Sequence, residues 1–293
     1  MRIANLSGRL VLVTESGAVD VEEASQGQFG SDPTAIYRRW DDFVAWAWST
    51  DLPPGTSFDH KDLGSPVPEP GQVFAIGLNY KEHALESGIT DFPVEPPVFT
   101  KFRSSITGPY GELELPTATV DWEAELVVVI GTEARFVSAE NAWDHVAGLT
   151  IAQDFSERTR QLVPPVPQFS IGKSFPGFTP IGPVVVTLDE FEKAGLDRAD
   201  LEIGCSLDGE QVQKGRTNDL IFSVPVLIER LSAVLPLQPG DIILTGTPSG
   251  VGGGMKPPRF LQVGEEVVTW IEGIGELRQK CVAGRPHTTA SAS

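Results

Sequence analysis

The sequence has little cysteine and no long apolar run. Cys205 and Cys281 are the two cysteines among 293 residues, and no CxxC pair occurs. This composition argues against a disulfide framework or a thiolate metal site, and it favours a reducing compartment. The N-terminal segment lacks the apolar core of a signal peptide, and no apolar run approaches the roughly 20 residues that a membrane helix needs. We therefore expect a cytoplasmic protein without a membrane span.

Basic residues are scarce as well. The chain has 22 lysines and arginines against 40 acidic residues, which gives a formal net charge of -18. Such a field repels nucleic acid and anionic membrane surfaces, so neither is an expected partner. It also repels small anions, so an anionic substrate requires local cations that reverse the field at its site. The apolar content of 40% is ample for one large domain, or for one large and one small domain.

The order of apolar, turn-forming and polar segments predicts an α+β protein that is rich in β-strands. Residues 1–69 are expected to form a small N-terminal α/β domain that ends in a linker rich in proline and glycine. Residues 70–282 show many short strands and few helices, which favours a barrel-like core of antiparallel or mixed strands. Residues 283–293 are expected to be a disordered tail.

One segment, VDWEAELVVVIG (Val120–Gly131), places three acids directly before an apolar run. On a continuous strand Asp121, Glu123 and Glu125 would project from one face. A solvated strand end is one interpretation. The other is a site for a hard divalent cation, because carboxylates without histidine or cysteine select Mg²⁺, Mn²⁺ or Ca²⁺. Such a site needs a further ligand, and Asp154 at the polar end of a second apolar strand is the candidate.

Other segments carry a candidate base and candidate cations. His83 and Glu86 are i and i+3 neighbours in an expected helix, and a carboxylate that orients an imidazole is the usual construction of a general base. A surface histidine is the alternative. Lys173 lies in an apolar loop, where it is expected to contact an anion or an acid. Arg158 and Gln161 belong either to a ligand site or to an ordinary exposed helix face.

A glycine-rich segment, LTGTPSGVGGG, begins at Leu244. It lacks the lysine and the spacing of a Walker A loop, so we reject nucleotide binding. Thr247 in this segment is a candidate hydroxyl for a ligand.

An ordered set of segments resembles the fumarylacetoacetate hydrolase family, in particular its bacterial 2-oxo acid hydrolases and decarboxylases. The resemblance covers about residues 73–252, and it implies a mixed β-roll fold, usually as a homodimer, with a small N-terminal domain in many bacterial members. The matching segments are AIGLNYKEHALESG, PPVFTKFRSSITGP, DWEAELVVVIG, GLTIAQDFSERTRQ, GKSFPGFTPIGP and DIILTGTPSGVG.

The resemblance also implies a metal site and a catalytic pair. Mg²⁺ or Mn²⁺, with Ca²⁺ as a substitute in vitro, would be held by Glu123, Glu125 and Asp154. In the family a His–Glu pair acts on a catalytic water, and it falls on His83 and Glu86.

The remaining family positions concern the substrate. The lysine of the G-K-S motif falls on Lys173. The arginine and glutamine that bind the acid end of the substrate fall on Arg158 and Gln161, and the threonine of T-G-T-P falls on Thr247.

This chain departs from the family pattern near the substrate positions. Arg160 replaces an aromatic residue, and Pro176 stands where aspartate is frequent. LVPPVPQF, at residues 162–169, is rich in proline where family members have a mobile lid. These departures bear on the identity of the substrate more than on the metal platform.

The resemblance leads to a hydrolase as the expected function. The substrate would be a small anionic 2-oxo acid with a second carbonyl, such as an acylpyruvate or fumarylpyruvate, which is cleaved to pyruvate and a second acid. His83 would remove a proton from water, hydroxide would attack the distal carbonyl, and the charge of the enolate would develop at the metal. Lys173, Arg158 and Lys101 would make the pocket cationic.

Other reactions on the same metal platform stay open at this stage. They are decarboxylation of oxaloacetate-like acids, isomerisation or hydration of products of aromatic ring cleavage, and hydrolysis of 2,4-dioxo sugar acids. A non-catalytic ligand-binding relative is the alternative from another class, and the full set of candidate residues argues against it.

Overall fold

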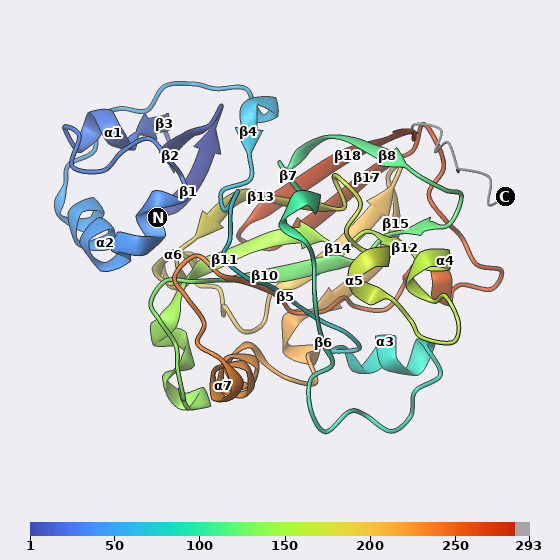
Figure 1. Cartoon of the computed structure of the whole chain (residues 1–293). Helices are drawn as coiled ribbons and strands as arrows, with labels where there is room; N and C mark the ends of the chain where they lie inside the picture. The colour runs from blue at the N-terminus through green and yellow to red at the C-terminus, as the bar shows by residue number, and fades with distance from the viewer. Residues whose placement is uncertain (285–293) are drawn as a thin grey trace, which may run out of the picture.

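The computed structural model describes residues 1–284, and within them the chain forms two main β-sheets with short helices around their edges (Figure 1). The larger sheet has 11 strands along the path β3-β2-β1-β13-β11-β10-β16-β5-β6, with β4 paired to β1 and β7 paired to β13. Its strands are β1 (Arg2–Leu6), β2 (Arg9–Thr14), β3 (Gly17–Asp20), β4 (Leu63–Gly64), β5 (Val73–Ile76), β6 (Val98–Thr100), β7 (Ile106–Thr107), β10 (Ala124–Ile130), β11 (Val146–Gln153), β13 (Thr179–Val186) and β16 (Ile242–Leu244).

The smaller sheet has five strands in the order β15-β14-β17-β18-β8, and β9 and β12 form a separate pair. The β-rich α+β architecture predicted from the sequence is confirmed. These strands are β8 (Tyr110–Leu115), β9 (Val120–Asp121), β12 (Ser156–Glu157), β14 (Glu202–Leu207), β15 (Glu210–Arg216), β17 (Glu266–Ile271) and β18 (Gly275–Ala283).

Strand β10 is buried on both faces, which explains its unbroken apolar run. Leu126 and Val128 pack in the core between the two sheets, where they join Ile203 of β14. Val127 and Val129 point to the other side, into a second core that includes Phe43 of the N-terminal region. The strand that carries Glu125 is therefore packed on both faces.

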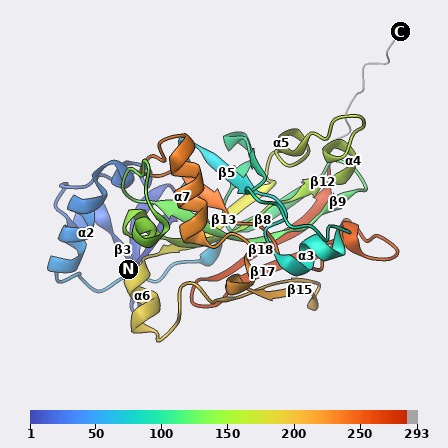
Figure 2. The same ribbon diagram turned by 90° about the horizontal axis from the view of Figure 1, so that it is seen from below.

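The helices are short, and several of them gather at one end of the molecule. Figures 1 and 2 show α3, α4 and α5 at the end opposite α2. The α-helices are α1 (Val21–Ala24), α2 (Trp40–Ser49), α3 (Lys81–Glu86), α4 (Arg158–Gln161), α5 (Phe169–Gly172), α6 (Leu188–Lys193) and α7 (Val224–Val234). The 3-10 turns are Ala35–Arg39, His60–Asp62, Arg103–Ser105, Ala139–His145, Thr217–Asp219 and Gly252–Gly254.

The N-terminal strands extend the larger sheet. β1 pairs with β13 in antiparallel fashion, with Arg2 opposite Val186 and Ile3 opposite Val185. The hydrogen-bonded sheet is therefore continuous across the boundary expected after residue 69, and the division into two domains stays a prediction. At the other end, Ala283 is the last residue of β18, although the sequence placed it in the tail. Residues 285–293 of that expected tail lie outside the described part of the chain.

The acidic segment is not one continuous strand. β9 ends at Asp121 and pairs with β12, whereas β10 begins at Ala124 and pairs with β11 and β16. The backbone N–H groups between them donate to side chains instead of a neighbouring strand: that of Trp122 to Asp121 Oδ1, and that of Glu123 to Gln153 Oε1. Side-chain acceptors that compete with the ladder interrupt the strand, so simple alternation does not place the three acids on one face.

Within residues 1–284, none of the helices combines the length and the apolar character needed to cross a bilayer.

Candidate metal and catalytic site

Three buried carboxylates converge at the start of β10 and the end of β11. Glu123, Glu125 and Asp154 present oxygen atoms that all lie within 4.8 Å of one another. Glu125 projects from β10, and its Oε2 accepts the backbone N–H of Gly246 at 2.7 Å. The backbone N–H of Asp154 donates to the carbonyl of Glu123 at 2.9 Å, which ties the two ligand-bearing segments together. The structure thus brings together the three residues expected to hold a metal.

Two buried lysines lie against these carboxylates. Lys173 Nζ is 2.7 Å from both Glu123 Oε2 and Asp154 Oδ2. Lys101 Nζ is 2.5 Å from Asp154 Oδ1, and it also donates to the backbone carbonyl of Lys173. Lys173 therefore contacts acids, as its apolar loop suggested. Both contacts of Lys101 are with protein groups, so its role in substrate binding stays a prediction.

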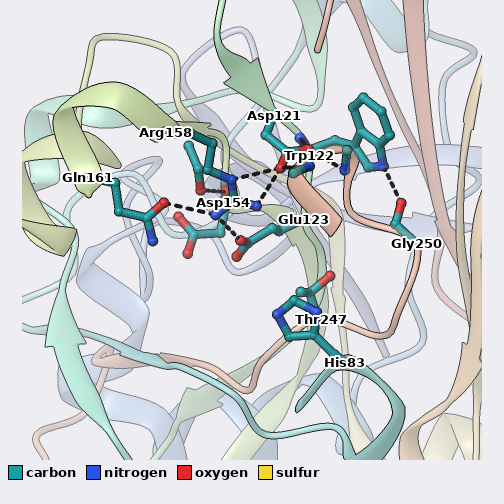
Figure 3. A network of polar contacts seen from close by, with 12 residues as sticks. His83, Asp121, Trp122, Glu123, Asp154, Arg158, Gln161, Thr247 and Gly250 are labelled. Carbon is teal, nitrogen blue, oxygen red and sulfur yellow. Dashed lines mark hydrogen bonds and ion pairs between the residues drawn. The ribbon is translucent and has the colours of Figure 1, made fainter. Parts of the chain in front are cut away.

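Arg158 links the metal cluster to the acid that stands apart from it. Its Nε and Nη2 lie 2.7 and 2.6 Å from Asp121 Oδ2, and its Nη1 lies 2.8 Å from Glu123 Oε1 (Figure 3). Nη1 also donates to Gln161 Oε1 at 2.8 Å. The Asp121 carboxylate accepts the N–H groups of Gly252 and Gly253 at 2.7 and 2.9 Å. Asp121 therefore holds Arg158 and a glycine turn, and substrate binding by Arg158 and Gln161 stays a prediction.

The charges of this cluster do not cancel. With all groups ionised, the three ligand carboxylates and the neighbouring Asp121 exceed the three cations Lys101, Lys173 and Arg158 by one negative charge. An uncompensated buried charge is costly, and a divalent cation reverses it to a net positive charge. All the candidate ligand atoms are carboxylate oxygens, the donors that Mg²⁺ and Mn²⁺ prefer. The residues therefore fit such an ion.

The two glutamates differ in how well protein cations compensate them. Burial alone would raise the pKa of Glu123, but the positive charges of Lys173 and Arg158 outweigh burial and lower that pKa to about 2. Burial, together with the negative charges of Asp154 and Glu123, raises the pKa of Glu125 well above its ordinary value of 4.5. Of the two glutamates, Glu125 therefore gains more from an added cation.

The expected catalytic pair forms on α3. His83 Nδ1 lies 3.2 Å from Glu86 Oε2, and the Glu86 carboxylate also accepts the N–H of Gly250. His83 is buried, with 8% of its surface exposed. Figure 3 shows His83 and Thr247 together on one side of the site, facing Glu123.

The glycine-rich segment after β16 reaches both sides of the site. Its backbone N–H groups donate to Glu125 from Gly246, to Glu86 from Gly250, and to Asp121 from Gly252 and Gly253. From the sequence, this segment was notable only for Thr247 as a candidate ligand hydroxyl and for the absence of a Walker A pattern. Its role as a row of backbone donors depends on contacts that sequence patterns do not reveal.

Two buried glutamines were missed altogether. Gln153 Oε1 accepts the N–H of Glu123 at 2.8 Å, and Gln213 Oε1 accepts the N–H of Ala124 at 2.9 Å. Gln213 Nε2 also donates to Thr247 Oγ1 at 2.8 Å. Gln213 lies in a hairpin strand that is largely exposed, and nothing in the local sequence distinguishes it from a surface glutamine.

Comparison with known proteins agrees with this geometry. The family model described as "Fumarylacetoacetate (FAA) hydrolase C-terminal" matches residues 72–282. The chain belongs to the fumarylacetoacetate hydrolase family. The family expected from the sequence motifs is thereby confirmed, and the matched range contains all the candidate site residues named above.

Relatives within the family carry names of different reactions. The human mitochondrial oxaloacetate tautomerase FAHD2A is 44% identical over 220 residues, which cover 74% of this chain and 68% of the human protein. A Mycobacterium smegmatis protein provisionally named HpcE is 51% identical, with a TM-score of 0.92 and coverage of 97% of this chain and 100% of that one.

A third relative was solved with ligands. The maleylpyruvate hydrolase of Sphingobium sp. SYK-6, in complex with manganese(II) ion and pyruvate, is 28% identical, with a TM-score of 0.76. The match covers 97% of this chain and 100% of that one.

Proposed function

We propose that this protein is a metal-dependent hydrolase that cleaves a C–C bond in a small 2,4-dioxo acid, such as an acylpyruvate or fumarylpyruvate, to pyruvate and a second acid. The observation that carries the proposal is a histidine oriented by a carboxylate, His83 with Glu86, across from the cluster of Glu123, Glu125 and Asp154. His83 offers a proton acceptor, and the carboxylate cluster offers a place for a cation that would bind an anionic substrate.

The three clustered carboxylates would hold Mg²⁺ or Mn²⁺. When bound, such an ion supplies a Lewis acid that polarises the 2-oxo acid and offsets its negative charge. Around it, Lys173 and Lys101 keep Glu123 and Asp154 paired and in place. The metal, with these cations and Arg158, would make the local field positive in a chain whose net charge is -18.

His83 and Glu86 would move the proton. Glu86 is held by the N–H of Gly250 and accepts from His83 Nδ1, so Nδ1 carries the proton and Nε2 is left free as a base. Nε2 takes a proton from water, and the oxygen forms a bond to the distal carbonyl carbon. The C–C bond then breaks, and its electron pair and a proton go to the pyruvate fragment. Thr247, Gln161 and Arg158 would bind the acid end of the substrate.

A panel of substrates tests the proposal. With Mg²⁺ present, release of pyruvate and a second acid from acylpyruvates or fumarylpyruvate is the expected result, and loss of activity with excess chelator should accompany it. His83→Ala should lower turnover by at least about 10²-fold, as for a lost general base, without changing Mn²⁺ affinity. Turnover close to that of the wild type would move the role of base to another residue.

A second reaction is favoured by a different observation. The human relative that is 44% identical is named an oxaloacetate tautomerase. Proton removal by His83 from the carbon next to the 2-oxo group, followed by its return to oxygen, interconverts keto and enol forms without water. A spectrophotometric assay of oxaloacetate enol absorbance distinguishes this reaction, because no second acid is released. CO₂ release from oxaloacetate would instead indicate decarboxylation.

A further inference from the structure

Gln213, on β15, is a buried side chain whose three polar contacts reach both the metal-bearing strand and the glycine-rich segment. Its exposed fraction is 1%. Gln213 Oε1 accepts the backbone N–H of Ala124 at 2.9 Å, and Nε2 donates to Thr247 Oγ1 and to the carbonyl of Pro248, both at 2.8 Å. Ala124 directly follows Glu123, and Thr247 directly follows the glycine that donates to Glu125.

The orientation of this amide is set by its two backbone partners. The N–H of Ala124 can only donate, so it requires the amide oxygen. The carbonyl of Pro248 can only accept, so it requires the amide nitrogen. A flipped Gln213 would place donor against donor and acceptor against acceptor, with the cost of two unsatisfied buried groups. The nitrogen of Gln213 therefore faces Thr247.

This orientation determines the direction of the Thr247 hydroxyl. Both amide hydrogens of Gln213 are in use, one on Thr247 Oγ1 and one on the Pro248 carbonyl. Thr247 Oγ1 is then an acceptor in this bond, and its own hydrogen must point elsewhere. Within residues 1–284 Thr247 Oγ1 makes no other hydrogen bond, although Thr247 is only 3% exposed. Thr247 lies beside His83 on the side of the site that faces Glu123 (Figure 3).

We propose that Gln213 is a positioning residue that forces the Thr247 hydroxyl to act as a hydrogen-bond donor toward an anionic oxygen of the bound 2-oxo acid. The selectivity follows from the direction of the bond: a carboxylate or enolate oxygen accepts the hydrogen, whereas a group that can only donate finds no acceptor there. This inference rests on the proposed function for the identity of the ligand, but the direction of the hydroxyl rests on the protein alone.

Neutron diffraction from deuterium-exchanged crystals of the wild-type protein tests the direction without any ligand. The expected density has two deuterons on Gln213 Nε2, one of them directed at Thr247 Oγ1, and the deuteron of Thr247 directed away from Gln213. A deuteron on the line from Thr247 Oγ1 to Gln213 would overturn the proposal.

A binding experiment tests the consequence, with oxalate as a stable two-oxygen mimic of a 2-oxo acid and Mg²⁺-loaded protein in a calorimeter. Gln213→Glu keeps the acceptor for Ala124 but removes the donors to Thr247 and to the Pro248 carbonyl, so the hydroxyl turns to donate to residue 213. We expect oxalate binding to weaken by about 10- to 100-fold, the range of a lost hydrogen bond to a charged group. Thr247→Ser should retain binding, and Thr247→Val should lose as much as Gln213→Glu.

Double variants separate positioning from a general effect of buried charge. In the Thr247→Val background, Gln213→Glu should cause little further loss, because the hydroxyl that it redirects is already absent. Gln153→Glu is the matched control: Gln153 also accepts a backbone N–H of this segment, but its nitrogen donates to Thr269 and Cys205. Its effect should be the same with or without the Thr247 hydroxyl.

The outcomes distinguish failure of the positioning role of Gln213 from failure of the proposed function. If Gln213→Glu weakens oxalate binding equally in the wild type and in the Thr247→Val variant, the positioning role is overturned. If wild-type protein with Mg²⁺ binds neither oxalate nor pyruvate, the proposed function fails, and the neutron result still decides the direction of the hydroxyl. If Gln213→Glu does not fold, Thr247→Val and Thr247→Ser with the neutron structure decide the proposal.

Discussion

Asp121 and Glu125 carry the same charge in the same motif, and the structure gives them different partners. Glu125 accepts one backbone N–H and lies within the ligand cluster. Asp121 lies outside that cluster, where it accepts from Arg158 and from the N–H groups of Gly252 and Gly253. The family resemblance left Asp121 out of the expected ligand set, and in the structure Asp121 supports Arg158 and the glycine turn instead.

This difference leads to a prediction for metal affinity. Glu125→Gln should weaken Mn²⁺ binding by more than the roughly 10- to 100-fold that is typical of losing a residue that only supports a ligand, because a ligand oxygen and a negative charge are lost together. Asp121→Asn removes the same charge from the same motif without removing a ligand. It is therefore the matched control, and it should weaken Mn²⁺ binding less than Glu125→Gln does. Calorimetric titration with Mn²⁺ measures both. Equal losses would remove Glu125 from the ligand set.

At the scale of elements, the segment after β16 connects the two sides of the site. The 3-10 turn Gly252–Gly254 brings its N–H groups to Asp121 and its last residue against Glu86. A Cβ added at Gly254 would lie 2.6 Å from the Glu86 Cγ and Cδ atoms. A side chain at position 254 would therefore displace Glu86.

Gly254→Ala should therefore lower turnover while leaving the fold intact. Glu86 must move to make room, and its flexible side chain can do so at little cost in stability, but His83 then loses its orienting carboxylate. We expect a loss of about 10- to 100-fold in turnover with an almost unchanged melting temperature. Gly30→Ala is the control, because a Cβ there meets no atom within 4 Å. Wild-type turnover in Gly254→Ala would argue against a role for the His83–Glu86 contact.

At the scale of the whole molecule, several buried groups bind protons more tightly in the folded protein than in the unfolded chain. Burial raises the pKa of the Cys205 thiol from 9.0 to about 12, and it raises the pKa of Tyr37 and of Tyr80. The pKa of Cys281 is likewise raised to about 12, chiefly by burial. Above about pH 9 the unfolded chain releases protons that the native state keeps, so stability falls as pH rises.

Urea unfolding should show this dependence directly. The midpoint should be lower at about pH 10.5 than at about pH 8, and Cys205→Ala should show a shallower fall because one of the contributing groups is gone. A midpoint that rises over this interval would contradict the predicted protonation of the buried groups.

The assembly is a further whole-molecule prediction. We expect a homodimer, in line with the resemblance noted from the sequence, and exposed apolar side chains around α4 and α5, such as Val166 at 61% and Leu162 at 57%, are consistent with a covered surface in solution. Light scattering coupled to size exclusion should give twice the chain mass of 31.6 kDa. A mass equal to one chain would contradict the prediction.

Much of the site could be predicted from sequence because its chemistry is local. The spacing of His83 and Glu86 on a helix brings their side chains together without help from the rest of the fold. In the structure His83 Nδ1 lies 3.2 Å from Glu86 Oε2. Carboxylates without histidine or cysteine point to a hard cation wherever they converge. The apolar run that forms β10 likewise predicted a buried strand, and all its residues are buried.

The kind of chemistry, the β-rich class and the family were therefore readable from the order of residues. The groups that support the chemistry became visible only in the folded chain, because their contacts join distant segments: Gly246 meets Glu125 across 121 residues, and Gln213 meets Ala124 across 89. The break between β9 and β10 has the same origin, since the side chains of Asp121 and Gln153 take the N–H groups that a continuous strand would have used. Local patterns carry periodicity and charge, whereas long-range hydrogen bonds depend on which strands pack together.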